Sequence, residues 1–115
     1  MSKSATDYLQ HILQECTFLL SLMETGLTKE ALLKDEVMKR AVVRSLEIIG
    51  EATKKIPADV KVKWDTVQWK NIAGMRDKLI HDYVGVDYTI VWDVIKNRIP
   101  DLAIQIQRIL ENVDA

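Results

Sequence analysis

The residues with the greatest capacity for chemistry lie close together, between positions 76 and 83 of the chain. Arg76 carries a fixed positive charge, His81 is one of only two histidines, and Tyr83 adds a phenol. A guanidinium binds a phosphate through two parallel hydrogen bonds, and an imidazole gives or takes a proton near neutral pH. Arginine and histidine together therefore supply what is needed to move a proton beside a bound phosphate.

Apolar spacing predicts that these residues lie on a helix over about 67–83, with Ile72, Met75, Leu79 and Tyr83 on one side. On a regular helix Arg76 and Tyr83 lie within about 20° of each other, whereas Arg76 and His81 diverge by about 140°. Arg76 and His81 then meet at one atom only if the helix ends near His81 or a second copy of the chain completes the site. Asp77 lies four residues before His81 and is placed to reach its ring.

Each of these residues also has an ordinary structural explanation. An arginine beside an aspartate on a helix is usually a solvated surface pair, and a histidine near a helix end is more often a cap than a catalyst. A tyrosine in an apolar stripe is most often a half-buried core residue. Charge and spacing alone therefore favour a catalytic site and a plain helix about equally.

The rest of the chain shows the periodicity of helices. We expect a first helix that begins near Thr6 or Asp7, runs to Glu24 and is closed by Gly26. A short helix capped by Thr28 should run through Leu33, and a long one should run from Asp35 to about Lys54 and be ended by Pro57. The last helix should be capped by Asp87. Pro100 marks a kink in the last helix or the first turn of a continuing one. For residues 57–68 we expect either an irregular connection or a short helix. The fold class is therefore all-α, an antiparallel bundle of four or five helices with a kinked C-terminal helix.

The apolar stripes name the expected core. They are Tyr8, Ile12, Cys16, Leu19 and Met23 in the first helix; Val37, Ala41, Ile48, Ala52 and Ile56, with Met38, Val42 and Ile49 beside them, in the long helix; and Val91, Ile95, Leu102, Ile106, Ile109 and Val113 in the last.

Composition sets outer bounds on the protein. A chain of 115 residues, 48 % hydrophobic and 29 % charged, is expected to form one helical domain over 1–115. A single cysteine allows no internal disulfide, and no run approaches the roughly 20 apolar residues of a membrane span. We therefore expect a cytoplasmic protein with no membrane association. Two histidines and one cysteine offer no zinc spacing, so no metal or other cofactor is expected.

With a net charge of −1, the surface as a whole is not basic enough to bind nucleic acid through charge alone. Residues 54–78 nevertheless hold seven basic and three acidic side chains, a local charge of +4. Lys70 and Lys78 are candidate RNA-binding residues there, although a solvated lysine face explains the same count. Trp64 and Trp69 could stack on bases, but packing within the bundle or a dimer is the simpler interpretation.

Arg76, His81 and Tyr83 form Arg-x4-His-x-Tyr, which resembles the signature of HepT-like toxins of the HEPN superfamily. The resemblance covers nearly the whole chain. Before the motif it is carried by residues 44–52, which precede Ile56-Pro57, and by residues 69–77, which lead into the motif. After the motif it is carried by Val86-Asp87, Trp92 and Pro100-Asp101-Leu102. It implies a helical homodimer whose two copies of the motif line a shared cleft, and a metal-independent endoribonuclease. Arg76 would hold the scissile phosphate, His81 would act as base on the ribose 2′-hydroxyl or as acid, and Asp77 would orient the pair.

The resemblance also implies a partner and a form of regulation. Such toxins, of a type VII-like toxin–antitoxin pair, are commonly encoded beside a nucleotidyltransferase antitoxin that adenylylates the motif tyrosine, here Tyr83. The added phosphate would exclude an RNA phosphate from Arg76 by bulk and charge. Two alternatives stay open: a non-catalytic module that binds nucleotide or a nucleotidyltransferase partner, and a purely structural bundle.

Overall fold

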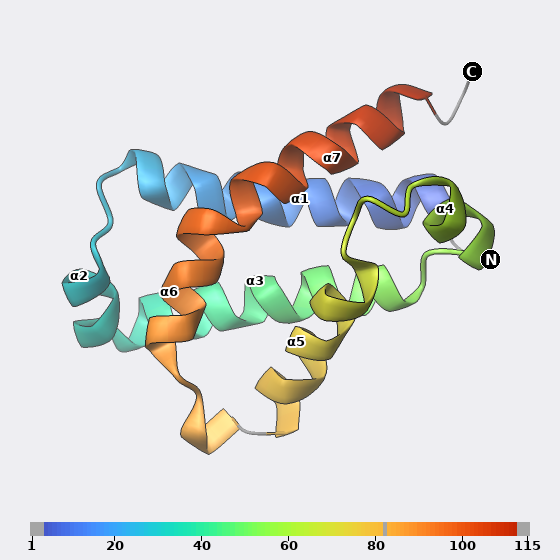
Figure 1. Cartoon of the computed structure of the whole chain (residues 1–115). Coiled ribbons are helices and arrows are strands. Elements are labelled where there is room, and N and C mark those ends of the chain that lie inside the picture. Colours follow the sequence, from blue (N-terminus) through green and yellow to red (C-terminus); the bar gives the residue numbers. More distant parts are fainter. Residues whose placement is uncertain (1–3, 82, 113–115) are drawn as a thin grey trace.

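The structure, a computed structural model, describes residues 4–81 and 83–112, without the side chain of Tyr83. Within these ranges the chain forms helices joined by short connections (Figure 1): α1 (Ala5–Glu24), α2 (Lys29–Lys34), α3 (Glu36–Lys54), α4 (Ala58–Lys63), α5 (Trp69–His81), the 3₁₀ turn η1 (Tyr83–Gly85), α6 (Tyr88–Asn97) and α7 (Ile99–Asn112). The prediction of an all-α fold is confirmed.

The long helices lie in a layered order. α1 packs against α7 on one side and α3 on the other, and α5 packs against the opposite side of α3 (Figure 1). α6 crosses steeply from the α5 end of the molecule back to α7, and also contacts α1 and α2. The helix with the predicted site is therefore joined to the core mainly through α3. None of the helices in the described ranges is long and apolar enough to cross a membrane.

The ends of α1 follow from local hydrogen bonding. The Asp7 amide donates to Ser4 Oγ and the Ser4 amide donates to Asp7 Oδ2, both at 3.2 Å, which is a capping box. The expected start at Thr6 or Asp7 is therefore wrong by a few residues, since Asp7 is the third helical residue and Ser4 is the cap. Gly26 follows the helix with a φ of 90°, which agrees with its predicted role at the C-terminal end.

The other predicted caps are confirmed. Thr28 Oγ1 accepts from the Ala31 amide at 3.1 Å, and Asp35 Oδ1 accepts from the Met38 amide at 3.0 Å. Asp87 Oδ1 accepts from the Thr89 amide at 2.9 Å. Residues 57–68 contain the short helix α4, which was one of the two interpretations of that segment.

The predicted stripe of α3 is partly wrong. Val37 is 77 % exposed, and Ala41 and Ile48 are only half-buried. The buried positions are Val42, Ser45, Leu46, Ile49, Gly50, Ala52 and Thr53. Two of these are polar, and they are buried because the Ser45 hydroxyl donates to the Glu15 carbonyl at 3.5 Å and the Thr53 hydroxyl to the Ile49 carbonyl at 2.8 Å. A stripe drawn only through apolar residues omits polar residues that can be buried because a backbone carbonyl accepts their hydrogen bond.

The C-terminal segment bends where Pro100 predicts a change. α6 ends with Arg98 as its cap and α7 begins at Ile99, so Pro100 lies in the first turn of α7 (Figure 1). A proline is tolerated in that turn because its missing N–H has no partner within the helix. The predicted core residues of this segment are buried, namely Val91, Ile95, Leu102, Ile106 and Ile109, and Val113 lies outside the described residues.

Candidate active site on α5

Two apolar anchors hold α5 near its ends. Trp69 and Leu79 are the buried residues of this helix, and Ile72 and Met75 between them are half-buried. The Trp69 indole N–H donates to the Trp64 carbonyl at 3.0 Å. Trp69 is therefore a packing residue, as the simpler interpretation had it.

Arg76 lies directly over a glycine of α3. A Cβ atom on Gly50 would lie 2.0 Å from Arg76 Cβ and 3.2 Å from Arg76 Cα. These atoms belong to the root of the side chain and to the backbone, so they cannot move away without shifting α5. Glycine at position 50 therefore allows α5 to approach α3 closely enough to rest the Arg76 stem on the α3 backbone.

Gly50 is not among the site residues predicted from the sequence. A usable signal was present, because glycine inside a helix costs about 1 kcal/mol relative to alanine and usually has a packing reason. What that signal lacks is the partner, since one helix pattern does not say which side chain another helix brings to the glycine.

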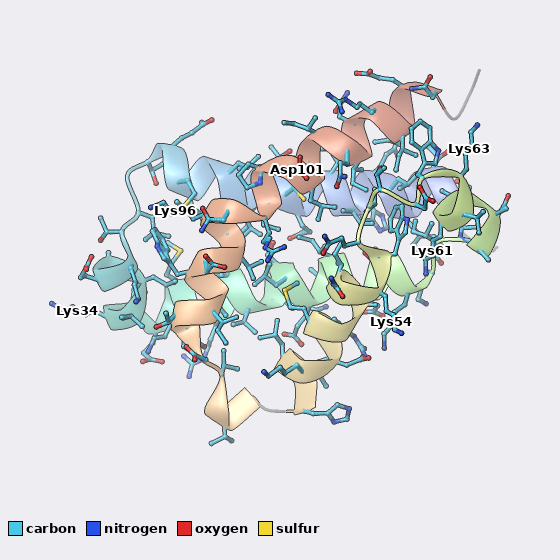
Figure 2. The ribbon with its side chains drawn as sticks, viewed as in Figure 1. Lys34, Lys54, Lys61, Lys63, Lys96 and Asp101 are labelled. Carbon is cyan, nitrogen blue, oxygen red and sulfur yellow. The ribbon has the colours of Figure 1, made fainter. Side chains whose placement is uncertain are left out.

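The polar end of Arg76 belongs to a three-residue ion cluster. Arg76 Nη1 donates to Asp77 Oδ1 at 3.1 Å, and the Lys54 ammonium binds the same oxygen. Figure 2 shows Lys54 near the end of α3 beside α5. The hydrogen bonds from Lys54, and then from Arg76, lower the pKa of Asp77 below its ordinary value, so this carboxylate is ionised near neutral pH.

The Arg76 guanidinium keeps capacity to bind an anion. Its side chain is 27 % exposed, and among the described residues its hydrogen bond to Asp77 uses only Nη1. Nε is buried and has no hydrogen-bond partner there. An arginine has five N–H donors in a fork that matches phosphate oxygens, so most of them are not engaged by this contact.

His81 is the last residue of α5 and is exposed. The helix thus ends at His81, earlier than the predicted Tyr83. A helix end near His81 was one of the two conditions under which Arg76 and His81 could act on one substrate. Asp77 was expected to reach the His81 ring, yet in the described part of the chain its carboxylate binds Arg76 and Lys54 and makes no hydrogen bond to His81. Tyr83 begins η1, and its side chain lies outside the part of the chain that the structure describes.

The basic side chains of residues 54–78 extend from α4 along α5. Lys70 and Lys78, the candidate RNA-binding residues, are both exposed on α5. Lys61 and Lys63 project from the neighbouring α4 (Figure 2). Lys70 lines a shallow hollow of about 550 Å³ together with Lys61. The fold therefore brings Lys61 and Lys70 together beside the start of α5, whereas Lys78 lies near its other end.

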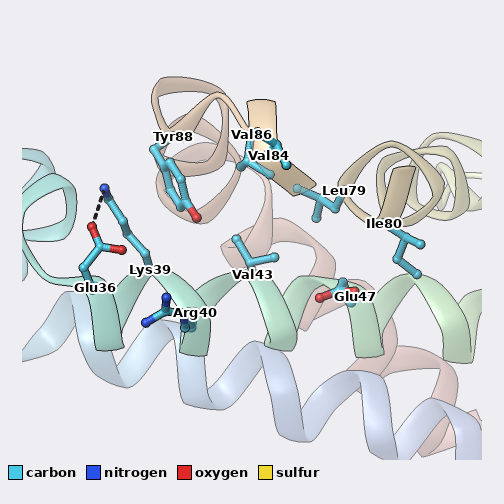
Figure 3. A pocket seen from close by; sticks show the side chains of 10 residues that line it. All are labelled: Glu36, Lys39, Arg40, Val43, Glu47, Leu79, Ile80, Val84, Val86 and Tyr88. Atoms are coloured by element: carbon cyan, nitrogen blue, oxygen red, sulfur yellow. Dashed lines mark hydrogen bonds and ion pairs between the residues drawn. The ribbon is translucent and has the colours of Figure 1, made fainter. Parts of the chain in front are cut away.

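An open groove of about 630 Å³ separates α3 from the corner formed by the end of α5, η1 and the start of α6 (Figure 3). Its lining combines charged residues of α3 with apolar residues of the corner: Glu36, Lys39, Arg40, Val43, Glu47, Leu79, Ile80, Val84, Val86 and Tyr88. Arg76, Asp77 and His81 do not line it. The site residues therefore lie on α5 beyond this groove.

Comparison with known proteins adds independent information. Residues 7–109 match the family described as "Ribonuclease HepT-like". The chain is 52 % identical over 109 residues to "Putative RNase TTE0752" of Caldanaerobacter subterraneus subsp. tengcongensis, which covers 95 % of this chain and 96 % of that protein. It is 43 % identical over 102 residues to "Probable ribonuclease HepT" of Thermococcus cleftensis, covering 89 % and 92 % of the two chains. No solved structure matches significantly.

Proposed function

The chain belongs to the HepT-like ribonuclease family, and we propose that it is an endoribonuclease toxin that cleaves RNA without a metal ion. The observation that carries this proposal is the placement of Arg76. Its guanidinium is half-buried on α5 with unengaged donors, five residues before an exposed histidine at the helix end. An anion-binding group and a proton-transfer group thus share one short segment of a family of ribonucleases.

The chemistry follows from these two groups. Arg76 binds the scissile phosphate and stabilises the charge that develops on its oxygens. The neutral imidazole of His81 takes the proton from the ribose 2′-hydroxyl, whose oxygen attacks the neighbouring phosphorus. The bond from phosphorus to the 5′-oxygen breaks, and a protonated histidine gives its proton to that oxygen. The products are a 2′,3′-cyclic phosphate and a free 5′-hydroxyl.

The reaction needs one basic and one acidic imidazole, and each chain supplies one at this position. A homodimer related by a twofold axis brings two copies of His81 to one cleft. The position of His81 at the exposed end of α5 supports this arrangement, because a partner chain can approach it there. Lys78, close to His81 on α5, and Lys70 and the lysines of α4 toward the other end of that helix then attract the RNA backbone along α5.

The protein works, in this proposal, as one cytoplasmic domain paired with a nucleotidyltransferase antitoxin. The antitoxin transfers adenylate from ATP to the Tyr83 hydroxyl and releases pyrophosphate. Tyr83 begins η1 two residues after His81, the last residue of α5, so we expect the added negative charge to lie beside the site. Incubation with the antitoxin and ATP should add one adenylate mass to the chain, and Tyr83→Phe should prevent it; an unchanged gain would move the modification elsewhere.

The deciding experiment is cleavage of a defined oligoribonucleotide in the presence of a chelator. Arg76→Ala and His81→Ala should each lower the rate by at least about 100-fold, because each removes a group that acts in the transition state. Lys34→Gln on α2 is the control and should cleave normally. Unaltered cleavage by both folded variants contradicts the site. A wild-type protein that never cuts RNA, but binds the nucleotidyltransferase tightly, would instead indicate a non-catalytic binding module.

A further inference from the structure

We propose that Lys54 and Gly50 of α3 position the Arg76 guanidinium, Gly50 by seating its stem and Lys54 by anchoring the carboxylate that holds its tip. The two residues are four apart and therefore lie one turn from each other on the same face of the helix. This inference rests on the proposed function, because it assigns to α3 the placement of the group that binds the scissile phosphate.

The first contact determines where the arginine side chain leaves α5. A Cβ at position 50 would lie 2.0 Å from Arg76 Cβ and 2.9 Å from Arg76 Cγ, so the real stem rests on a backbone surface with no side chain in between. Cα, Cβ and Cγ of Arg76 are thereby held at a definite height above α3. Such close packing leaves the stem few alternative paths.

The second contact holds the tip. Arg76 and Asp77 are adjacent on one helix, and a pair of neighbours can move together without being tied to anything else. The Lys54 ammonium binds the same Asp77 oxygen that accepts from Arg76 Nη1, and so connects the pair to α3. The tip of Arg76 is thus tied to the same helix that supports its stem.

The charge of this cluster is suited to binding a phosphate. Two cations share one carboxylate, which leaves a net charge of +1 on Lys54, Asp77 and Arg76. Without Lys54, Asp77 would neutralise the neighbouring guanidinium alone. Lys54 therefore both restrains the carboxylate and preserves the attraction of Arg76 for the charge that develops on the phosphate in the transition state.

Steady-state cleavage kinetics separate positioning from simple charge. Lys54→Gln should lower kcat by roughly 10-fold and change KM less than about twofold, because a displaced guanidinium weakens the transition state more than RNA binding. Lys54→Arg keeps a cation within reach of Asp77 and should restore most of the rate. Lys70→Gln should show the opposite pattern, with a raised KM that depends on salt concentration. A raised KM with normal kcat in Lys54→Gln would overturn the proposal.

A double variant tests whether Lys54 acts through Asp77. In Asp77→Asn the carboxylate is absent, so adding Lys54→Gln should change kcat by less than about twofold. If the two losses multiply instead, Lys54 acts on the substrate by itself and is not a positioning residue.

The Gly50 contact has its own matched pair of variants. Gly50→Ala places a methyl against Arg76 and should lower kcat by roughly 10-fold in the folded protein. Gly74→Ala adds the same methyl on α5, where nothing lies within 4 Å, and should leave kcat unchanged. Equal rates in the two variants contradict the Gly50 half of the proposal. If Gly50→Ala does not fold while Gly74→Ala does, the added methyl has displaced α5 from α3, which supports the close seat of Arg76 on Gly50.

An NMR measurement separates this inference from the proposed function. The Arg76 Nε–H signal should be sharp in the wild-type protein without RNA, and should broaden or shift in Lys54→Gln but not in Lys34→Gln. If the wild type fails to cut RNA and the signal still responds, the positioning holds and the ribonuclease assignment fails. If the wild type cuts RNA and Lys54→Gln leaves both signal and kcat unchanged, the positioning alone is wrong.

Discussion

α1 and α5 lie on opposite sides of α3 and treat their contact faces differently (Figure 1). α1 buries an unbroken row of small and medium apolar residues, namely Leu9, Ile12, Cys16 and Leu19. α5 buries Trp69 near its start and Leu79 near its end, and between them it places the charged pair Arg76 and Asp77. α1 thus contributes mainly to the hydrophobic core, whereas α5 presents charged side chains at the protein surface.

The two helices also differ in what burial does to a reactive group. Burial raises the pKa of the Cys16 thiol on α1 to about 12, so this sulfur stays protonated and inert at neutral pH. On α5, Arg76 is only half-buried and Asp77 remains charged between two cations. A full apolar seat for α5 would have required removing these charges from water at a large free-energy cost. The contact face of α5 is therefore close-packed but only partly apolar, and it leaves these charges in reach of water.

The largest expected effect breaks the α1 side of this comparison. Ile12→Ala leaves a cavity in the fully buried row and should lower the free energy of unfolding by about 2–5 kcal/mol. Val62→Ala, at an exposed residue of α4, should change it by less than about 0.5 kcal/mol. Urea unfolding followed by circular dichroism measures both. Cleavage per folded molecule should stay normal in Ile12→Ala, and a lost activity in its folded fraction would contradict the separation of core and site.

The second effect breaks the α5 side. Arg76→Lys keeps a positive charge on the same stem but removes the planar fork that binds two phosphate oxygens. Cleavage should fall by roughly 10- to 100-fold, with little change in urea midpoint, since the aliphatic part of the stem still rests on Gly50. Full activity in this variant would show that Arg76 acts only as a point charge.

The comparison also explains which features could be predicted from the sequence. Apolar spacing identified Ile12, Cys16 and Leu19 of α1, although it missed Leu9 and included the half-buried Tyr8 and Met23. The caps Thr28, Asp35 and Asp87 were identified by their residue types at the expected helix starts. Arg76 and His81 stood out because their side chains carry chemistry and their flanks resemble a known family.

The missed contacts around Arg76 depend on a second helix. Gly50 matters only because α5 brings Arg76 over it, and Lys54 only because Asp77 arrives beside it. The buried face of α3 was misplaced for the same reason, since Ser45 becomes buriable through the Glu15 carbonyl of α1. A pattern along one helix contains no information about which atoms a neighbouring helix supplies, so these contacts needed the three-dimensional structure.

A third prediction concerns the face of α5 that points away from α3. Gly74 lies in its middle, is exposed, and has no atom within 4 Å of an added Cβ. Gly74→Ala should therefore raise the free energy of unfolding by about 0.5–1 kcal/mol, because alanine loses less backbone entropy in a helix. Urea unfolding at pH 7 measures the change. A loss of stability would mean that α5 is packed more tightly at this position than the structure shows.

The smallest effect concerns the pH dependence of the Asp77 cluster. Because the pKa of Asp77 is lowered in the folded state, its contribution to stability is complete above the ordinary aspartate value of about 4 and is lost as pH falls through the lower folded value. The urea midpoint of wild type should therefore exceed that of Asp77→Asn slightly at pH 7, and the two should converge below pH 4. Lys54→Gln removes the first cause of the lowered pKa, so in that background the difference at pH 7 should be smaller and the convergence should be complete at a higher pH. A constant difference down to pH 2 would show that Asp77 contributes through packing rather than through its charge.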